Sequence, residues 1–213
     1  MKNLVITTLG ECNHYNTWAG ESTNYDLHCI DYRINPTFKY QGIARSLSNN
    51  PCLLEYDYYW MPDEDIWIKP DMLNIFFQRM SDYSLWMGQP SVLMSNDSFP
   101  SWKCFVHQDN NIELIYTNFI EIMCPCFSRE ALEECLSTFN KSNSGWGLDL
   151  VWSKIGNGKR MGIINSVVVK HTRPVGGGDL YGALKKKGIR PSWERKKLMR
   201  EYGIKSIDIK TWI

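Results

Sequence analysis

The sequence lacks a long apolar run and any marked excess of charge of one sign, and each absence excludes a class of function. No apolar window in its 213 residues approaches the length of a membrane span. The formal net charge of +1 argues against a surface built as a whole to bind nucleic acid. Met1-Lys2-Asn3 leads directly into a short predicted strand and not into a signal peptide. We therefore expect a cytoplasmic protein with no membrane span and no nucleic-acid partner.

The cysteines lack the pattern of a disulfide framework. There are seven, an odd number, without regular spacing. Cys124-Pro-Cys126 lies in an apolar run, and no second Cys/His pair at zinc-like spacing accompanies it. We expect reduced and mostly buried thiols, as in a cytosolic protein.

Internal repeats and low-complexity stretches are also absent, and what remains is the pattern of one α/β domain over residues 1–213. The predicted strands are 4–9, 25–32, 53–61, 112–116, 119–127, 161–164 and 167–169, and Gln89-Pro90-Ser91 is predicted as a turn. The predicted helices are 41–48, 72–80, 129–139 capped by Ser128, 148–155 and 184–202. This alternation predicts a mixed, mostly parallel central sheet flanked by helices. A hinge at residues 176–178 would lead into a basic helical C-terminal tail, 176–213.

The chain is organised around residues 53–68, which read LLEYDYYWMPDEDIWI. The first part predicts a buried strand, and Pro62, which cannot donate to a ladder, would end its pairing. Asp63, Glu64 and Asp65 then lie at the strand exit, where an open α/β sheet places its ligand site. In extended backbone Asp63 and Asp65 point the same way, and a hard divalent cation is the usual partner of two adjacent carboxylates. The alternative is a solvated acidic turn.

Three further stretches are candidates for a functional role, and each also has a simpler structural explanation. Asp149 follows Gly145-Trp146-Gly147 in the first turn of a predicted helix, as a base or only as an N-terminal charge. His171 ends a predicted strand, as a metal ligand or as a structural histidine. The basic segment 185–200 is a solvated helical face or a contact for phosphate or an acidic partner.

Four blocks in this order resemble the GT-A class of nucleotide-sugar glycosyltransferases. They are Pro62–Asp65, Phe119–Arg129, Gly145–Asp149, and the strand from Gly162-Ile163-Ile164 to Val169-Lys170-His171. In detail they are similar to the glycosyltransferase-like family shared by plants and microbes, the DUF707 type. The resemblance covers roughly residues 50–172. It implies a single GT-A-like, Rossmann-like domain with a nucleotide-sugar-binding half, 1–100, and an acceptor-binding half, 101–175.

The resemblance also implies a metal site. Asp63 and Asp65 match the Asp-x-Asp motif of the class, so Asp65 is an expected ligand of Mn²⁺ or Mg²⁺, and Asp63 is expected to bind metal, ribose or both. His171 matches the histidine that completes the metal site in many GT-A enzymes. Further expected contacts to the nucleotide sugar are Glu64 beside this motif, and Thr7, Thr8, Asp31 and Tyr32 at the ends of the first two strands.

On the acceptor side, the Gly-Trp-Gly-x-Asp block resembles a motif of inverting galactosyltransferases. Trp146 and Gly147 are then expected at the acceptor sugar, and Asp149 as the base that accepts the acceptor proton. Leu148 departs from the pattern, because those enzymes have Gly or an acidic residue there.

The expected activity is metal-dependent transfer of a hexosyl or deoxyhexosyl group from a UDP-sugar to a saccharide acceptor, with inversion. A non-catalytic sugar-binding module, a nucleotidyltransferase and an interaction domain with a basic docking helix are the alternatives. Leu9-Gly10-Glu11-Cys12 does not supply the Gly-rich, basic phosphate loop of a nucleotidyltransferase. The partners considered also include further domains, should this sequence be part of a longer chain.

Overall fold

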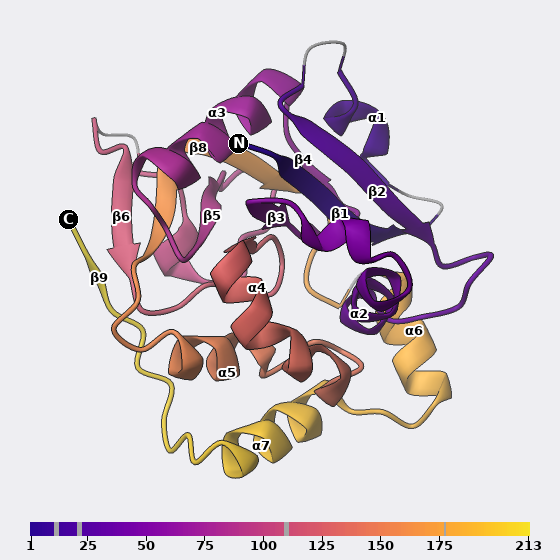
Figure 1. The fold of residues 1–213 in the computed structure, drawn as a ribbon. Coiled ribbons are helices and arrows are strands. Elements are labelled where there is room, and N and C mark those ends of the chain that lie inside the picture. Colours follow the sequence, from indigo (N-terminus) through magenta and orange to yellow (C-terminus); the bar gives the residue numbers. More distant parts are fainter. Residues whose placement is uncertain (11–12, 21–22, 109–110, 177) are drawn as a thin grey trace.

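A mixed β-sheet runs through the molecule between layers of helices (Figure 1). The computed structural model describes residues 1–10, 13–20, 23–108, 111–176 and 178–213. Along the sheet the strand order is β2-β1-β3-β7-β5-β8-β6-β9, and β4 pairs with β8. The strands are β1 (Asn3–Leu9), β2 (Tyr25–Asp31), β3 (Tyr58–Trp60), β4 (Ile66–Trp67), β5 (Met87–Val92), β6 (Leu114–Thr117), β7 (Cys126–Ser128), β8 (Met161–His171) and β9 (Thr211–Trp212). The chain is therefore a single α/β domain, consistent with the expected GT-A-like class.

Helices cover both faces of the sheet. The α-helices are α1 (Tyr15–Trp18), α2 (Lys39–Asn49), α3 (Pro70–Asp82), α4 (Arg129–Cys135), α5 (Leu148–Ile155), α6 (Asp179–Lys186) and α7 (Pro191–Glu201). Short 3₁₀ helices span Pro51–Leu54, Lys103–Phe105 and Leu136–Lys141. One apolar cluster lies under α1 and α3, and a second lies under α2, α4, α5 and α7. The sheet thus separates two cores.

The alternation of β1 shows why the two cores form. Val5 belongs to the core under α3, while Leu4 and Ile6 belong to the core under α2 and α4. Successive side chains of a strand point to opposite faces, so an apolar run such as β1 fits a strand that is covered on both sides.

The sheet is mixed, as expected, and its longest strand pairs are parallel, although antiparallel pairs are more numerous. Among the strand pairs of the described residues, β1–β2, β1–β3 and β5–β8 are parallel. The other five pairs are antiparallel: β3–β7, β4–β8, β5–β7, β6–β8 and β6–β9. The reason is that β7, β6 and β9 arrive from loops and not from right-handed helical crossovers.

Two predicted strands are much shorter than expected. Of 53–61 only Tyr58–Trp60 pairs, because Pro51 begins a 3₁₀ turn and β1 offers partners only to residues 58–60. Of 119–127 only the end belongs to β7. The loop before it instead accepts hydrogen bonds from the backbone of Met61 and Asp63, at 2.8 and 2.7 Å.

Two proline positions also differ from expectation. Pro90 lies inside the buried strand β5, where the register to β8 shifts between Pro90 and Ser91, and such a bulge accommodates a residue without an N–H. The helix predicted at 184–202 is two helices, because Gly188 has a φ of 68° and Pro191 starts α7. The C-terminal segment then ends in β9, so it is not purely helical.

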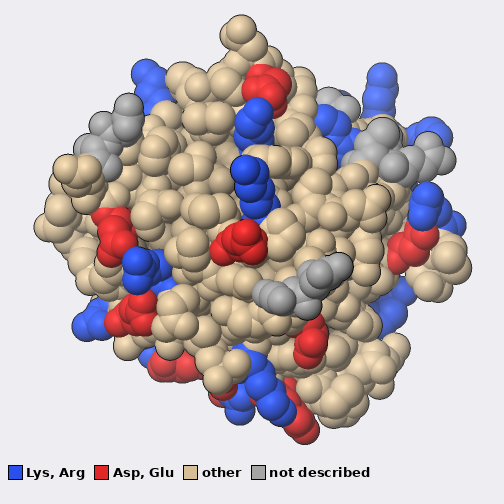
Figure 2. All heavy atoms as spheres, turned by 90° about the horizontal axis from the view of Figure 1, so that it is seen from above, with Lys and Arg blue, Asp and Glu red and all other residues tan. Residues whose placement is uncertain are grey.

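On the face seen in Figure 2, basic and acidic side chains are interspersed. This distribution agrees with the net charge of +1. No helix among the described residues is long and apolar enough to cross a membrane.

Candidate functional site

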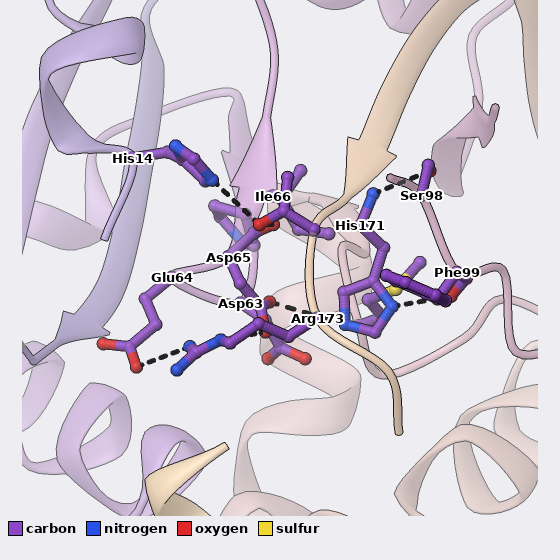
Figure 3. A network of polar contacts seen from close by, with 12 residues as sticks. His14, Asp63, Glu64, Asp65, Ile66, Ser98, Phe99, His171 and Arg173 are labelled. Atoms are coloured by element: carbon purple, nitrogen blue, oxygen red, sulfur yellow. Dashed lines mark hydrogen bonds and ion pairs between the residues drawn. The ribbon is translucent and has the colours of Figure 1, made fainter. Parts of the chain in front are cut away.

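The short strand β4 brings the acidic motif to the end of β8. Ile66 lies opposite His171 in this antiparallel pair, and the N–H of Thr172 donates to the carbonyl of Asp65 at 3.0 Å. The backbone turns after Asp63, whose carbonyl accepts from Ile66 N at 3.2 Å, and is not extended as predicted. Asp63, Asp65 and His171 nevertheless converge, with one potential ligand atom of each within 4.8 Å of the others (Figure 3).

The orientation of His171 suits a metal ligand. Its Nδ1–H donates to the carbonyl of Phe99 at 2.8 Å, since a carbonyl only accepts. Nε2 is then the ring nitrogen that faces the cluster, 3.5 Å from Asp65 Oδ1, and it can serve as a ligand atom once it gives up its proton. Asp65 Oδ1 is buried and has no hydrogen-bond partner in the described part of the chain. A buried carboxylate oxygen without a partner beside an imidazole nitrogen is a donor set that fits a divalent cation.

Two basic side chains balance the three carboxylates. Lys39 Nζ donates to Asp63 Oδ1 at 2.8 Å. Arg173 donates from Nε to Asp65 Oδ2 at 2.9 Å and from Nη2 to Glu64 Oε1 at 2.8 Å. Glu64 also accepts from Gly10 N and, at 3.3 Å, from the Tyr32 hydroxyl. Glu64 therefore connects the end of β1 to Asp65 through Arg173.

The charges of this cluster depend on one another. Burial alone would lower the pKa of His171, but the carboxylate of Asp65 outweighs it and raises that pKa to about 9. Burial would likewise raise the pKa of Asp65, and His171 and Arg173 together hold it below its usual value.

A cleft of about 550 Å³ connects this cluster to the predicted acceptor side. The predicted site residues that line it are Thr8, Tyr32, Asp63, Glu64, Asp65, Trp146, Gly147, Asp149 and His171. Two others lie elsewhere. Thr7 is fully buried and donates its hydroxyl to the carbonyl of Pro62, and Asp31 accepts from Arg33 Nε at 2.8 Å. Both are thus engaged within the fold.

Asp149 lies in the cleft wall at the start of α5. Its Oδ1 accepts from the backbone N–H of Leu150 at 2.8 Å, and the residue is 8% exposed. Burial raises the pKa of Asp149 to about 6, against the backbone N–H groups and Arg195, which favour the charged form. The carboxylate is therefore ionised at neutral pH with a basicity above that of a solvated aspartate.

Helix α7 fixes the loop that leads to Asp149. Glu194 accepts from the backbone N–H groups of Asn143 and Ser144, both at 2.9 Å, and from the Ser144 hydroxyl at 2.6 Å. The guanidinium of Arg195 lies 5.4 Å from the centre of the Trp146 ring. Gly147 has a φ of 94°, and a Cβ there would lie 2.9 Å from Arg195 Cα, so only glycine fits.

Sequence reasoning missed four residues around the cleft: Lys39, Glu121, Arg173 and Glu194. Glu121 had a recognisable signal, a single carboxylate within the apolar run Phe119–Met123. Arg173 follows the predicted ligand His171 by two positions. Lys39 and Glu194 had no recognisable signal in the sequence, because each contacts a segment more than 20 residues away.

The comparisons with known proteins assign no function to the chain. No family model matches the chain, and no curated protein sequence matches it. Among solved structures, the crystal structure of A197 from STIV is similar, with a TM-score of 0.47 and 12% identity. That similarity covers 80% of this chain and 85% of that chain. At this level it carries no argument about what the site does.

Proposed function

We propose that the protein is a metal-dependent glycosyltransferase that moves a sugar from a UDP-sugar to a saccharide acceptor with inversion, in the cytoplasm. One observation carries the proposal: the Asp63–Asp65–His171 cluster and the buried Asp149 line the same cleft. A nucleotide sugar needs a cation site at its diphosphate and a base on the far side of its anomeric carbon, and this cleft offers both. We further propose that the chain is a relative of the DUF707-type family.

In this proposal Asp63, Asp65 and His171 hold Mn²⁺ or Mg²⁺. When bound, the ion stabilises the negative charge that develops on the leaving diphosphate. Arg173 pairs with Asp65 and adds a positive charge beside the same carboxylates, while Lys39 keeps Asp63 in place. Thr8 and Tyr32, also in the cleft wall, are the proposed contacts to the nucleotide.

Asp149 acts as the general base. It takes the proton of the acceptor hydroxyl, the acceptor oxygen bonds to the anomeric carbon, and the bond from that carbon to the phosphate oxygen breaks with its electron pair leaving on UDP. Single displacement from the opposite face inverts the anomeric centre. Trp146 offers an aromatic surface on which the acceptor sugar packs.

Calorimetric titration tests the donor site. UDP, and GDP for comparison, is titrated with and without Mn²⁺ into the wild type, Asp65→Ala and Asp97→Ala. Asp97 is the matched control, because its carboxylate is exposed, does not line the cleft, and accepts from Ser95 at 2.6 Å and Lys170 at 2.7 Å. We expect metal-dependent UDP binding in the wild type and in Asp97→Ala, and at least a tenfold loss in Asp65→Ala, as for the loss of a charged ligand.

Two results would contradict the proposal. Metal-supported UDP affinity that survives in Asp65→Ala removes the metal assignment. A wild type that binds neither UDP nor GDP under any metal condition removes the donor site, and a non-catalytic sugar-binding module then explains the cleft better.

A further inference from the structure

Glu121 is a cleft residue to which the proposed reaction assigns no role. It belongs to the loop that precedes β7, and its backbone N–H donates to Gln89 Oε1 at 2.8 Å. The residue is 5% exposed and lines the cleft. Its Oε2 is buried and has no hydrogen-bond partner in the described part of the chain.

A buried oxygen without a partner is costly, which makes its presence informative. An unsatisfied buried polar atom destabilises a fold by about 1–3 kcal/mol. Since Oε2 of Glu121 makes no hydrogen bond in the described part of the chain, an apolar residue of similar size at this position would lose none of that oxygen's bonds. A carboxyl group that folding does not use is available to a ligand.

The position of Glu121 identifies which part of a ligand it would meet. The charges of Asp149, His171 and Asp63 all act on its carboxyl, and the four residues line the same cleft. Glu121 is therefore near both the proposed base and the proposed cation cluster. In single displacement the transferred sugar lies between these two groups, with its diphosphate at the cation and its anomeric carbon toward the base.

The carboxyl groups of Glu121 and Asp149 differ in protonation state. Burial raises the pKa of Glu121 to about 8, with the charge of Asp149 adding to it and Ser101 and His171 opposing it. At neutral pH this carboxyl is mostly protonated, and it presents an O–H donor as well as an acceptor. Asp149, held by backbone N–H groups, stays ionised. In such a pair the protonated Glu121 can donate to a hydroxyl oxygen, while the ionised Asp149 can accept a proton.

We propose that Glu121 hydrogen-bonds a ring hydroxyl of the transferred sugar and so determines which UDP-sugar the protein accepts. This inference rests on the proposed function, because it needs a UDP-sugar in the cleft. A polar site built around a hydroxyl rejects a sugar that lacks or misplaces it, since the buried carboxyl is then left without a partner.

The test compares Glu121→Leu and Glu121→Gln with the wild type in the presence of Mn²⁺. The probes are UDP and whichever of UDP-glucose, UDP-galactose and UDP-N-acetylglucosamine the wild type binds most tightly. Leu removes both hydrogen-bonding oxygens, whereas Gln stays neutral and keeps a donor and an acceptor. We expect Glu121→Leu to weaken UDP-sugar binding about tenfold with UDP binding unchanged, and Glu121→Gln to stay within about threefold of the wild type.

Thermal unfolding separates this role from a structural one. Because Oε2 has no partner, Glu121→Leu should unfold at the same temperature as the wild type or higher. If Glu121→Leu is less stable and also loses affinity for UDP, Glu121 has a structural role. If Glu121→Leu keeps the UDP-sugar affinity of the wild type, Glu121 has no role in binding the sugar. Both outcomes overturn the inference, as does a Gln variant as weak as the Leu variant. A wild type that binds no nucleotide overturns the proposed function and this inference together.

Discussion

At the scale of the residue, the ionised Asp149 is expected to lower the stability of the fold while it serves as the proposed base. Its pKa of about 6 in the folded protein exceeds the ordinary 3.8. The folded state therefore binds the proton more tightly, and this stabilisation is complete below about pH 4 and is lost as pH rises through 6. Asp149→Asn resembles the protonated form, and its amide oxygen can still accept from Leu150 N.

We therefore predict that Asp149→Asn raises the free energy of unfolding by about 1–3 kcal/mol at pH 7.5 and changes it little at pH 4. Its turnover should fall about 10²–10⁴-fold while metal-dependent UDP binding persists. Chemical denaturation at the two pH values and a donor-consumption assay measure both effects. Normal turnover would exclude Asp149 as the base, and an equal effect on stability at both pH values would exclude the burial argument.

The candidate metal ligands could be predicted from the sequence because they lie at the ends of predicted strands. Asp63, Asp65 and His171 follow strands, and ends of strands converge at one edge of a sheet, so their convergence could be predicted without coordinates. Glu121 and Arg173 could not be assigned in this way. Their roles depend on which atoms remain unpaired after folding, and side-chain pairing of that kind is settled by tertiary packing.

At the scale of the element, α7 is expected to hold the loop at residues 142–147 through one carboxylate. The bonds from Asn143 and Ser144 outweigh the effect of burial and keep the pKa of Glu194 below its usual value. We predict that Glu194→Ala lowers the free energy of unfolding by about 2 kcal/mol, as expected for hydrogen bonds to a charged group. Amide hydrogen exchange in residues 142–147 should rise with it.

Glu201→Ala is the control for that experiment. Glu201 lies on the same helix, but its ion pair with Lys141 is solvent-exposed, with exposed side-chain fractions of 40% and 36%. Such surface pairs contribute about 0–1 kcal/mol, so little change is expected. If the two variants are equally destabilised, or if exchange in the loop is unaltered in Glu194→Ala, α7 does not position the loop at residues 142–147.

Elements with local signals were predicted well, and those that depend on distant partners were not. The helix at 148–155 and the cap by Ser128, whose hydroxyl accepts from Ala131 N at 3.1 Å, follow from neighbouring residues alone. The strand expected at 53–61 is apolar enough to be a strand throughout. It pairs over three residues only, because its extent is decided by the partners that β1 and β7 offer.

At the scale of the whole molecule, the α/β class follows from the alternation of apolar strands and amphipathic helices. The pairing of β4 with β8, which brings Asp63 and Asp65 to His171, joins residues more than 100 positions apart and has no counterpart in the local pattern. The integration of segment 176–213 has the same origin. Its residues include Tyr181 and Arg195 in the cleft wall, Leu198 in the core, and β9 on the sheet edge.

This integration predicts that the C-terminal segment unfolds together with the sheet. Leu198 is fully buried in the core formed by α2, α4 and α5, so Leu198→Ala should lower the free energy of unfolding by about 2–5 kcal/mol. Trp212 is the control, because it is 51% exposed on the edge strand β9, and Trp212→Ala should cost about 1 kcal/mol or less. Circular dichroism and tryptophan fluorescence should report one coincident transition in Leu198→Ala, shifted to lower denaturant. An earlier, separate transition in that variant would instead mean that residues 176–213 are a tail docked on an independently stable domain.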